Sequence, residues 1–394
     1  MTEHWIWFAT RRGFGPVRQR EILERFGSAE AVWEATESLL KRACQILLDK
    51  DLTEARSILA ACQRAEVSVL TLRDPAYPTF LRAIADPPAV LYVRGTLPDT
   101  DRIPCVGIVG SRSADRRGLE MAHLLGWQIV GCGGAVVTGM AKGIDAMAAR
   151  GALGNGGAVI GVLGCGPDLV YPRENADLYA QVLVRGCLIT EYPPGTPPAA
   201  THFPARNRII SALSDGVVVV QAAERSGALI TASWAAEQGR DVFAVPGPAG
   251  EELSRGCNRL LREGAILTES GWDVMCEYEY RYPGKVTEYH GRPEPRRSDV
   301  PPPDPSRPPD VSPARKRQQA VPAAAQKPQP DPARLSEPQQ TLIRTLKNGP
   351  LQLDVLLDRV ELPSSVVLSQ LTMLQIKGVV AQRPGKIYEL TIKY

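Results

Sequence analysis

The 394-residue sequence predicts an α/β protein whose largest part is a doubly wound parallel sheet. Between residues 105 and 275, short continuous apolar runs alternate with amphipathic stretches of helical periodicity. Such alternation is typical of parallel strands covered by helices on both faces. Because crossovers between parallel strands are right-handed, the arrangement is Rossmann-like, and its ligands should bind at the carboxyl ends of the strands.

Residues 1–70 predict a helical domain. Three stretches have apolar residues at three- and four-residue spacing: REILERFGS, AEAVWEATESLLKRA and DLTEARSILAACQRAE. Before the first of them, Gly13-Phe14-Gly15-Pro16 resembles the turn of a helix-hairpin-helix, whose backbone N–H groups can face a phosphate. We therefore describe this region as SAM/helix-hairpin-helix-like, and a packing or protein-contact role is the alternative. Residues 71–104 predict an irregular connector with one strand, AVLYVRG.

The predicted core domain spans residues 105–280. Its candidate strands are CVGIVG, AVVTG, GAVIGVLG, CLITEY, GVVVVQA, DVFAVPG and AILTE. Its candidate helices are RRGLEMAHLLGWQIVG, KGIDAMAARGALG, ENADLYAQVLVRG, RNRIISALS, GALITASWAAEQG and RGCNRLLREG. Each strand is followed by a loop at which a ligand can bind.

A Pro-rich linker at 281–334 separates this core from a small C-terminal module at 335–394. Thirteen of the 34 prolines lie in residues 291–332, with few large apolar side chains, so this segment is predicted to be disordered. The sequence of this module predicts three helices and a hairpin that turns at Arg383-Pro384-Gly385, which is the winged-helix pattern. Its third helix carries no basic residue before Lys377, so protein contact is favoured over reading of duplex bases.

The composition is that of a globular protein, with 44% hydrophobic and 23% charged residues and a net charge of +3. That charge is unevenly distributed: residues 1–290 carry −3, residues 291–334 carry +4 and residues 335–394 carry +2. An anion site in the core must therefore rest on a local group of basic residues. No apolar run reaches the roughly 18 residues of a membrane span, and no signal peptide is visible, so a cytoplasmic protein is expected. Eight cysteines without a C-x-x-C pair indicate reduced, buried thiols.

Two glycine-rich loops follow the first strands of the core. In GIVGSR, Gly110 allows the backbone to approach a ligand closely, and free N–H groups at the start of the following helix can hold an anion. Arg112 can add two hydrogen bonds to a phosphate. A plain strand-to-helix turn explains this motif equally well. In TGMAKGID, Lys142 is a candidate anion ligand. The structural alternative is that Asp145 caps the helix or pairs with Lys142. Neither loop has the spacing of a dinucleotide fingerprint or of a Walker A motif.

Two further motifs precede helices later in the core. HFPARNRII combines Phe203 with Arg206, Asn207 and Arg208, and such a mixture of aromatic and basic residues can stack bases and contact phosphates. The alternative is a core phenylalanine with solvated arginines. In ERSGALITA, Ser226 and Gly227 begin a helix whose first N–H groups could hold an anion. No acid–base pair, metal motif or nucleophile is recognisable, so no catalytic residue, cofactor or metal is predicted.

Together, these motifs closely resemble the DNA-processing protein A family (DprA, also called Smf). The resemblance rests on DPAYPTFLRAIADPP, GIVGSR, TGMAKGIDAMA, GVLGCGPDLVYP, FPARNRIISALSDGVVVVQAAERSGALITA and VFAVPGPAGEELSRGCNRLLREGA. It implies a bacterial protein that binds and protects single-stranded DNA in natural transformation and recombination. It also implies loading of the RecA recombinase onto that DNA, a homodimer built through the core, and no enzymatic turnover.

The family's strand-binding pocket carries over to two motifs of this sequence. They supply Gly110, Ser111, Arg112, Phe203, Arg206, Asn207 and Arg208, and neighbouring loops add Lys142, Ser226, Gly227 and Thr231. The residue between Pro204 and Arg206 is basic in some relatives but is Ala205 here. The alternative function is a Rossmann-like enzyme that binds or cleaves a nucleotide. A duplex-reading regulator acting through residues 335–394 is a third hypothesis.

Overall fold

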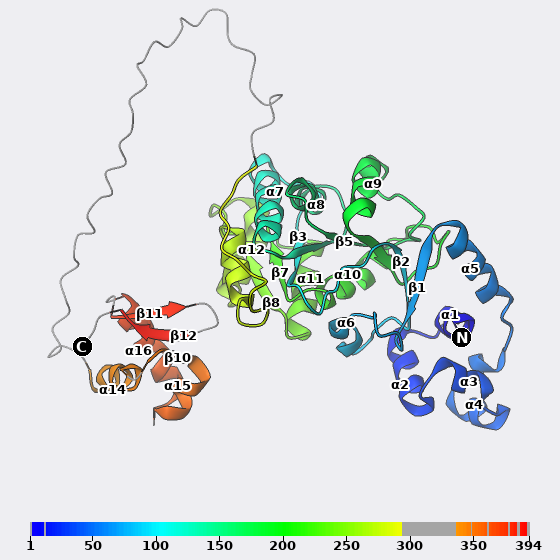
Figure 1. Cartoon of the computed structure of the whole chain (residues 1–394), viewed down its shortest axis with the longest axis horizontal. Coiled ribbons are helices and arrows are strands. Elements are labelled where there is room, and N and C mark those ends of the chain that lie inside the picture. Colours follow the sequence, from blue (N-terminus) through cyan, green and yellow to red (C-terminus); the bar gives the residue numbers. More distant parts are fainter. Residues whose placement is uncertain are drawn as a thin grey trace, which may run out of the picture. The chain divides into compact units, whose positions relative to one another are not determined.

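The computed structural model divides into two compact units, Met1–Pro293 and Glu294–Tyr394 (Figure 1). It describes residues 2–11, 13–293, 336–347, 349–360, 362–376, 379–383 and 387–391. The predicted linker at 281–334 therefore lies outside the described residues from position 294 onward.

The first unit is built on one nine-stranded sheet with the order β1-β2-β6-β5-β4-β3-β7-β8-β9. The strands β3 to β9 run parallel, and all seven correspond to the predicted apolar runs, which confirms the doubly wound α/β class. The bounds are β1 Val67–Thr71, β2 Val90–Gly95, β3 Cys105–Val109, β4 Ala135–Thr138, β5 Val159–Val162, β6 Cys187–Thr190, β7 Gly216–Val219, β8 Asp241–Ala244 and β9 Ile266–Leu267.

Helices cover both faces of this sheet (Figure 1). One face packs against α7 (Arg116–Gly131), α8 (Ile144–Gly154), α9 (Ala176–Arg185) and α13 (Gly271–Met275). The other packs against α6 (Thr79–Ala83), α10 (His202–Ala212), α11 (Gly227–Glu237) and α12 (Glu252–Arg262). Within β3, Val106 and Ile108 enter the first core while Cys105 and Val109 enter the second, as the two-residue period of a strand requires.

The connector predicted at 71–104 is part of the sheet. The strand β2 pairs antiparallel with β6, and β1 pairs antiparallel with β2 at the edge. The strand in AVLYVRG was predicted, whereas β1 was placed within the helical region. Its five residues follow directly on a helix and bury only their two end positions fully, so they show neither a clear alternation nor a continuous apolar run.

The helical domain contains α1 (Thr2–Thr10), α2 (Pro16–Phe26), α3 (Ala29–Glu34), α4 (Glu37–Ala43) and α5 (Thr53–Arg64). The helix α1 was not predicted, because its run of large apolar residues has no helical period. Its Trp7 and Phe8 are fully buried in a core that also includes Tyr92 of β2, so this domain packs on the β1–β2 end of the sheet. In the Gly-Phe-Gly turn, Phe14 is buried against Phe8 with ring centres 5.0 Å apart.

The second unit has the predicted winged-helix pattern. Its elements are α14 (Glu337–Leu346), β10 (Leu351–Gln352), α15 (Leu353–Arg359), α16 (Ser364–Ile376), β11 (Val380–Arg383) and β12 (Ile387–Leu390). The strands form an antiparallel sheet of order β10-β12-β11. A small core holds it together, with Leu342, Leu356, Leu371 and Tyr388 buried. Residues 384 and 385 of the predicted hairpin turn lie outside the described residues.

Two properties expected from the composition can be compared with this fold. None of the described helices is long and apolar enough to cross a membrane. All eight cysteines are free thiols, and all but the half-exposed Cys276 are buried.

Candidate functional site

A cavity of about 660 Å³ opens at the carboxyl ends of the central strands. It lies where the strand order reverses: after β3 the chain continues toward β6 on one side, while β7 to β9 lie on the other. Such a reversal leaves a crevice in which open α/β sheets bind their ligands. Nine of the eleven predicted site residues line it: Gly110, Ser111, Arg112, Phe203, Arg206, Asn207, Ser226, Gly227 and Thr231. Lys142 and Arg208 do not.

The loop after β3 is held tightly by backbone contacts. The amide of Ser111 donates to the carbonyl of Gln221 at 2.7 Å, and the amide of Ile144 donates to the carbonyl of Ser111 at 3.2 Å. Gly143 has a φ of +76°, and a Cβ there would lie 2.3 Å from the Ser111 oxygen. A Cβ on Gly110 would lie 2.6 Å from the Ile144 side chain. Both glycines are therefore needed for the close packing of this loop against the start of α8.

A cation and two aromatic rings adjoin one another along the cavity. The guanidinium carbon of the exposed Arg112 lies 5.4 Å from the ring centre of Phe203, and among the described residues it has no ion-pair partner. The ring of Tyr171, which is 41% exposed, is also 5.4 Å from that of Phe203, with an angle of 33° between their planes. This combination offers a positive charge next to flat apolar surfaces.

The N-terminus of α11 forms another part of the cavity. Ser226 caps this helix, since its hydroxyl accepts a hydrogen bond from the amide of Ala228 at 3.3 Å, and Gly227 is exposed. The amide of the Asn207 side chain donates to the carbonyl of Gly227 at 3.4 Å, which links α10 to this turn. Because the N-terminus of a helix carries partial positive charge and free N–H groups, it favours an anion in this position.

Arg206 lines the cavity, but its charged end is buried. Its Nη1 donates to the carbonyl of Gly139 at 2.7 Å and to that of Val162, and its side chain is almost fully buried. Burial lowers the pKa of Arg206, and the charge of the nearby Asp145 carboxylate opposes this effect. Burial also raises the pKa of Asp145, which accepts the amide of Gly139 at 3.0 Å. Arg206 therefore joins the loop after β4 to the end of β5, whereas a direct phosphate contact was expected.

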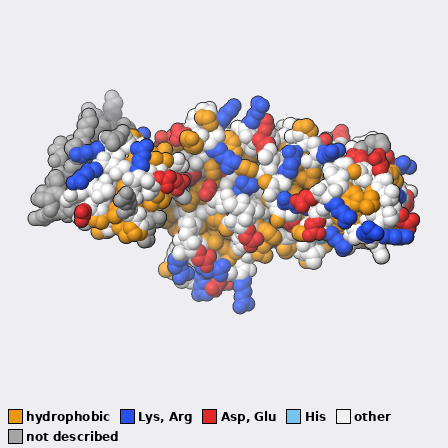
Figure 2. Space-filling model, turned by 90° about the horizontal axis from the view of Figure 1, so that it is seen from below, with side chains coloured by type: hydrophobic (Ala, Val, Ile, Leu, Met, Phe, Trp, Pro, Cys, Tyr) orange, Lys and Arg blue, Asp and Glu red, His pale blue; other side chains and the backbone are white. Residues whose placement is uncertain are grey.

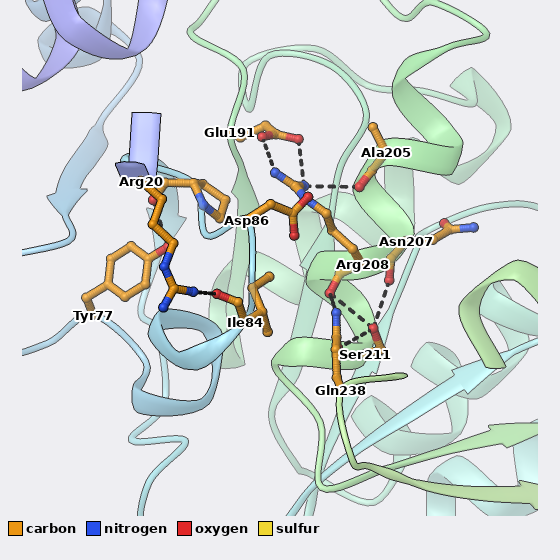
Figure 3. A network of polar contacts seen from close by, with 11 residues as sticks. Arg20, Tyr77, Ile84, Asp86, Glu191, Ala205, Asn207, Arg208, Ser211 and Gln238 are labelled. Carbon is orange, nitrogen blue, oxygen red and sulfur yellow. Dashed lines mark hydrogen bonds and ion pairs between the residues drawn. The ribbon is translucent and has the colours of Figure 1, made fainter. Parts of the chain in front are cut away.

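Arg208 points away from the cavity, contrary to the prediction. Its Nε donates to Asp86 at 2.8 Å, and its Nη1 and Nη2 donate to the two carboxylate oxygens of Glu191 at 3.0 and 2.8 Å (Figure 3). Its side chain is only 4% exposed. All charge-carrying nitrogens of Arg208 thus have partners inside the protein, so this arginine is not available to a phosphate.

Lys142 is exposed next to the cavity and forms an ion pair with Glu174, which was not a predicted partner. Its Nζ lies 2.5 Å from a carboxylate oxygen of Glu174, and this contact lowers the pKa of Glu174. Both side chains are more than half exposed, so the pair contributes little to stability. Asp145, the partner weighed for Lys142, instead accepts backbone amides.

Some lining residues were not predicted as site residues. They include Tyr171, Ile230 and the stretch Pro198–Ala200. Tyr171 belongs to the segment GVLGCGPDLVYP, which contains the end of β5 and the loop after it and which contributed to the family resemblance but to no predicted site residue. The only available signal was its position after the carboxyl end of a strand.

Comparison with known families agrees with this architecture. Residues 68–279 match the family described as DNA recombination-mediator protein A, and residues 326–386 match the DprA winged helix domain. The chain belongs to the DprA family. The first match covers the whole nine-stranded sheet except the first residue of β1, together with every residue that lines the cavity.

Individual relatives of the DprA family extend this result. DNA processing protein DprA of Streptococcus pneumoniae is 43% identical over 212 residues, which is 53% of this chain and 74% of that protein. Protein Smf of Synechocystis is 37% identical over 280 residues, or 68% of this chain and 70% of that protein. The X-ray structure of DprA from Streptococcus pneumoniae aligns with a TM-score of 0.61 at 35% identity, covering 70% of this chain and 98% of that one.

Membership of the DprA family assigns the chain to DNA processing. On the face drawn in Figure 2, Lys and Arg side chains are interspersed with Asp and Glu side chains, so that face carries no broad basic surface. The cavity at the sheet's reversal point provides a local site, with Arg112 and the α11 N-terminus on its border. Within the described part of the chain, no group of three or more His, Cys, Asp or Glu residues could hold a metal ion.

Proposed function

We propose that this DprA-family protein binds single-stranded DNA without sequence specificity and that the cavity between β3 and β7 is its binding site. The observation that carries this proposal is the position of Arg112, which is exposed, lacks an ion-pair partner among the described residues and stands over Phe203 at the cavity's edge. A single strand presents both a phosphate for the guanidinium and an unpaired base for the ring.

The two halves of the site receive different parts of a nucleotide. A phosphate lies between Arg112 and the amides at the start of α11, where the helix dipole and the guanidinium both favour negative charge. A base stacks on Phe203 or Tyr171, and because every base has a flat face, this contact does not depend on sequence. A base inside a duplex is paired and stacked on its neighbours, so double-stranded DNA binds more weakly.

Membership of the DprA family supports a proposal for the cellular role. The family is described as DNA recombination-mediator protein A. In this proposal, the protein protects single strands and promotes loading of RecA onto them in DNA uptake and recombination. We propose that it acts in the cytoplasm as a homodimer and without catalytic turnover or a cofactor. The buried charges of Asp145 and Arg206 support a binding role, because both are engaged with backbone groups at Gly139.

A gel-shift titration with labelled single- and double-stranded oligonucleotides, with and without RecA, tests the proposal. We expect tight binding of single strands, weak binding of duplexes and a larger fraction of RecA on DNA when the protein is present. Equal affinity for duplex and single strands would contradict it.

Two variations of the experiment separate the other hypotheses. A chain lacking residues 335–394 should retain most of its single-strand affinity, whereas a duplex-reading role of the winged helix predicts that binding is lost. Incubation with nucleoside monophosphates and analysis of the products tests the nucleotide-cleaving alternative, for which cleaved product is the deciding result.

A further inference from the structure

The helix α10 presents two different surfaces. Phe203 and Asn207 are one turn apart on the surface that borders the cavity. Arg208 follows Asn207 and is therefore rotated by about 100° around the helix axis. Figure 3 shows the side chains of Asn207 and Arg208 leaving the helix in different directions.

Arg208 joins α10 to two other segments through an ion-pair cluster, which consists of Arg208, Asp86 and Glu191. Glu191 follows the end of β6 and binds the guanidinium with both oxygens, while Asp86 lies in the loop before β2. The two carboxylates are 16% and 20% exposed. Burial disfavours the charged form of Arg208, but Glu191 and Asp86 outweigh it and raise the pKa of Arg208.

The same region fixes α10 at further points. The Gln238 side chain, at the C-cap of α11, donates to the carbonyl of Arg208 at 3.1 Å and accepts the hydroxyl of Ser211 at 2.7 Å. The loop that contains Asp86 is itself held by the helical domain, since Arg20 of α2 donates to the carbonyl of Ile84 at 2.5 Å (Figure 3). The cluster thus lies between the helical domain and the two helices that border the cavity.

We propose that Arg208 is a positioning residue of the DNA site: with Asp86 and Glu191 it sets the rotation and position of α10, and so the placement of Phe203 and Asn207. This inference rests on the proposed function and names a role for Arg208 different from phosphate contact. A planar guanidinium bound by a carboxylate at two points restricts orientation, which a packed apolar side chain does not do to the same degree.

Neutralising Asp86 distinguishes a positioning role of Arg208 from a phosphate contact, because the two roles predict different changes in single-strand affinity. If Arg208 positions α10, Asp86→Asn removes one of its anchors and weakens binding of a single-stranded oligonucleotide by roughly threefold or more. If Arg208 contacts phosphate, the same change removes one of its two carboxylate partners and a negative charge, so binding becomes equal or tighter. The matched control is Glu37→Gln, which removes one carboxylate from the exposed pair with Lys41 in α4 and should leave affinity unchanged.

The salt dependence of binding provides a second readout, which separates the loss of a phosphate contact from other losses of affinity. Each phosphate contact contributes about −0.7 to the slope of log affinity against log salt concentration. Asp86→Asn and Arg208→Met should lower affinity with an unchanged slope, whereas Arg112→Ala should reduce the slope. Thermal melting identifies variants that fail to fold, and Asp86→Asn is the milder change because Glu191 still holds Arg208.

The outcomes also separate this inference from the proposed function. Absence of single-strand binding by the wild-type protein would overturn the proposed function. Normal wild-type binding with unchanged or tighter binding by folded Asp86→Asn would overturn the positioning role only. A slope reduced by Arg208→Met to the extent seen for Arg112→Ala would also assign Arg208 to phosphate contact.

Discussion

The guanidinium of Arg112 stands 5.4 Å from the ring centre of Phe203, although Arg112 lies in the loop after β3 and Phe203 lies in α10. This contact orients the arginine without neutralising it, so its charge remains available to a phosphate. It also means that the charge and the ring can be tested separately, because one contributes a salt-dependent and the other a salt-independent part of DNA binding.

Replacing Arg112 with alanine should weaken single-strand binding by about tenfold and reduce the salt slope by about 0.7, the contribution of one phosphate contact. Fluorescence anisotropy of a labelled oligonucleotide at several salt concentrations measures both quantities. Arg102→Ala is the control, since Arg102 is an exposed arginine outside the cavity lining. Identical affinities and slopes for wild type and Arg112→Ala would remove Arg112 from the site.

Replacing Phe203 with leucine should weaken binding by about 1–3 kcal/mol, the range for loss of one base–aromatic stack, with little change in the salt slope. Leucine keeps the apolar packing of this half-buried side chain but has no flat face. Stacking also quenches fluorescent base analogues, so an oligonucleotide with 2-aminopurine gives an independent signal. Full quenching by the variant would show that no base stacks on Phe203.

The strands of the core could be predicted because each is a continuous apolar run bounded by glycine or polar turns. The helix α7 was predicted at its observed bounds, since Asp115 caps its start and accepts the amide of Gly118. The edge strand β1 was not predicted, because it is defined by pairing with β2 and not by a pattern of its own. The local sequence thus predicts the strands that are buried on both faces. It does not predict an edge strand whose structure depends on pairing with the next strand.

The position of the candidate site could be predicted, but the roles of some of its residues could not. Its loops follow from the carboxyl ends of the strands, so Gly110, Arg112 and Phe203 were found. The roles of Arg206 and Arg208 could not be predicted in the same way. The partners of Arg208 are 122 and 17 positions away along the chain, and motif spacing carries no information about carboxylates brought there by folding.

Replacing Ala205 with lysine should tighten single-strand binding about two- to fivefold and steepen the salt slope by about 0.7, as expected for one added phosphate contact. Ala205 is exposed and lies between two residues that line the cavity, so a long basic side chain can reach a strand bound there. Ala205→Gln adds similar length without charge and should leave the slope unchanged. A lysine variant with the wild-type slope would place the bound phosphates elsewhere.

Replacing Gly143 with alanine should destabilise the protein by about 1 kcal/mol or more, because its backbone has a φ of +76° and the new Cβ would meet the Ser111 carbonyl at 2.3 Å. Relief of this clash moves the loop that contains Arg112, so DNA affinity should fall as well. Gly250→Ala is the control: it has a similar φ of +90° but open space around the position of its Cβ. Equal losses of affinity in both variants would argue against a specific effect on the site.

The buried thiols should make stability depend on pH in the alkaline range. Burial raises the pKa of Cys132 from 9.0 to about 11, while in the unfolded chain the thiol has its ordinary pKa. Between these values the unfolded state loses a proton that the native state keeps, so this contribution to stability is complete below pH 9 and declines as pH rises toward 11. At pH 10 the loss is about 1.4 kcal/mol for one such thiol.

Other groups also titrate in this range, so the effect of Cys132 is best measured as a difference. Urea unfolding of wild type and Cys132→Ala, both in reducing buffer, gives the difference in unfolding free energy at pH 8 and pH 10. Wild type should be more stable at pH 8, because alanine leaves a small cavity at this fully buried position. That advantage should shrink by about 1.4 kcal/mol at pH 10, since only wild type carries the ionising thiol. A difference that does not vary with pH would mean that Cys132 titrates alike in the folded and unfolded chain.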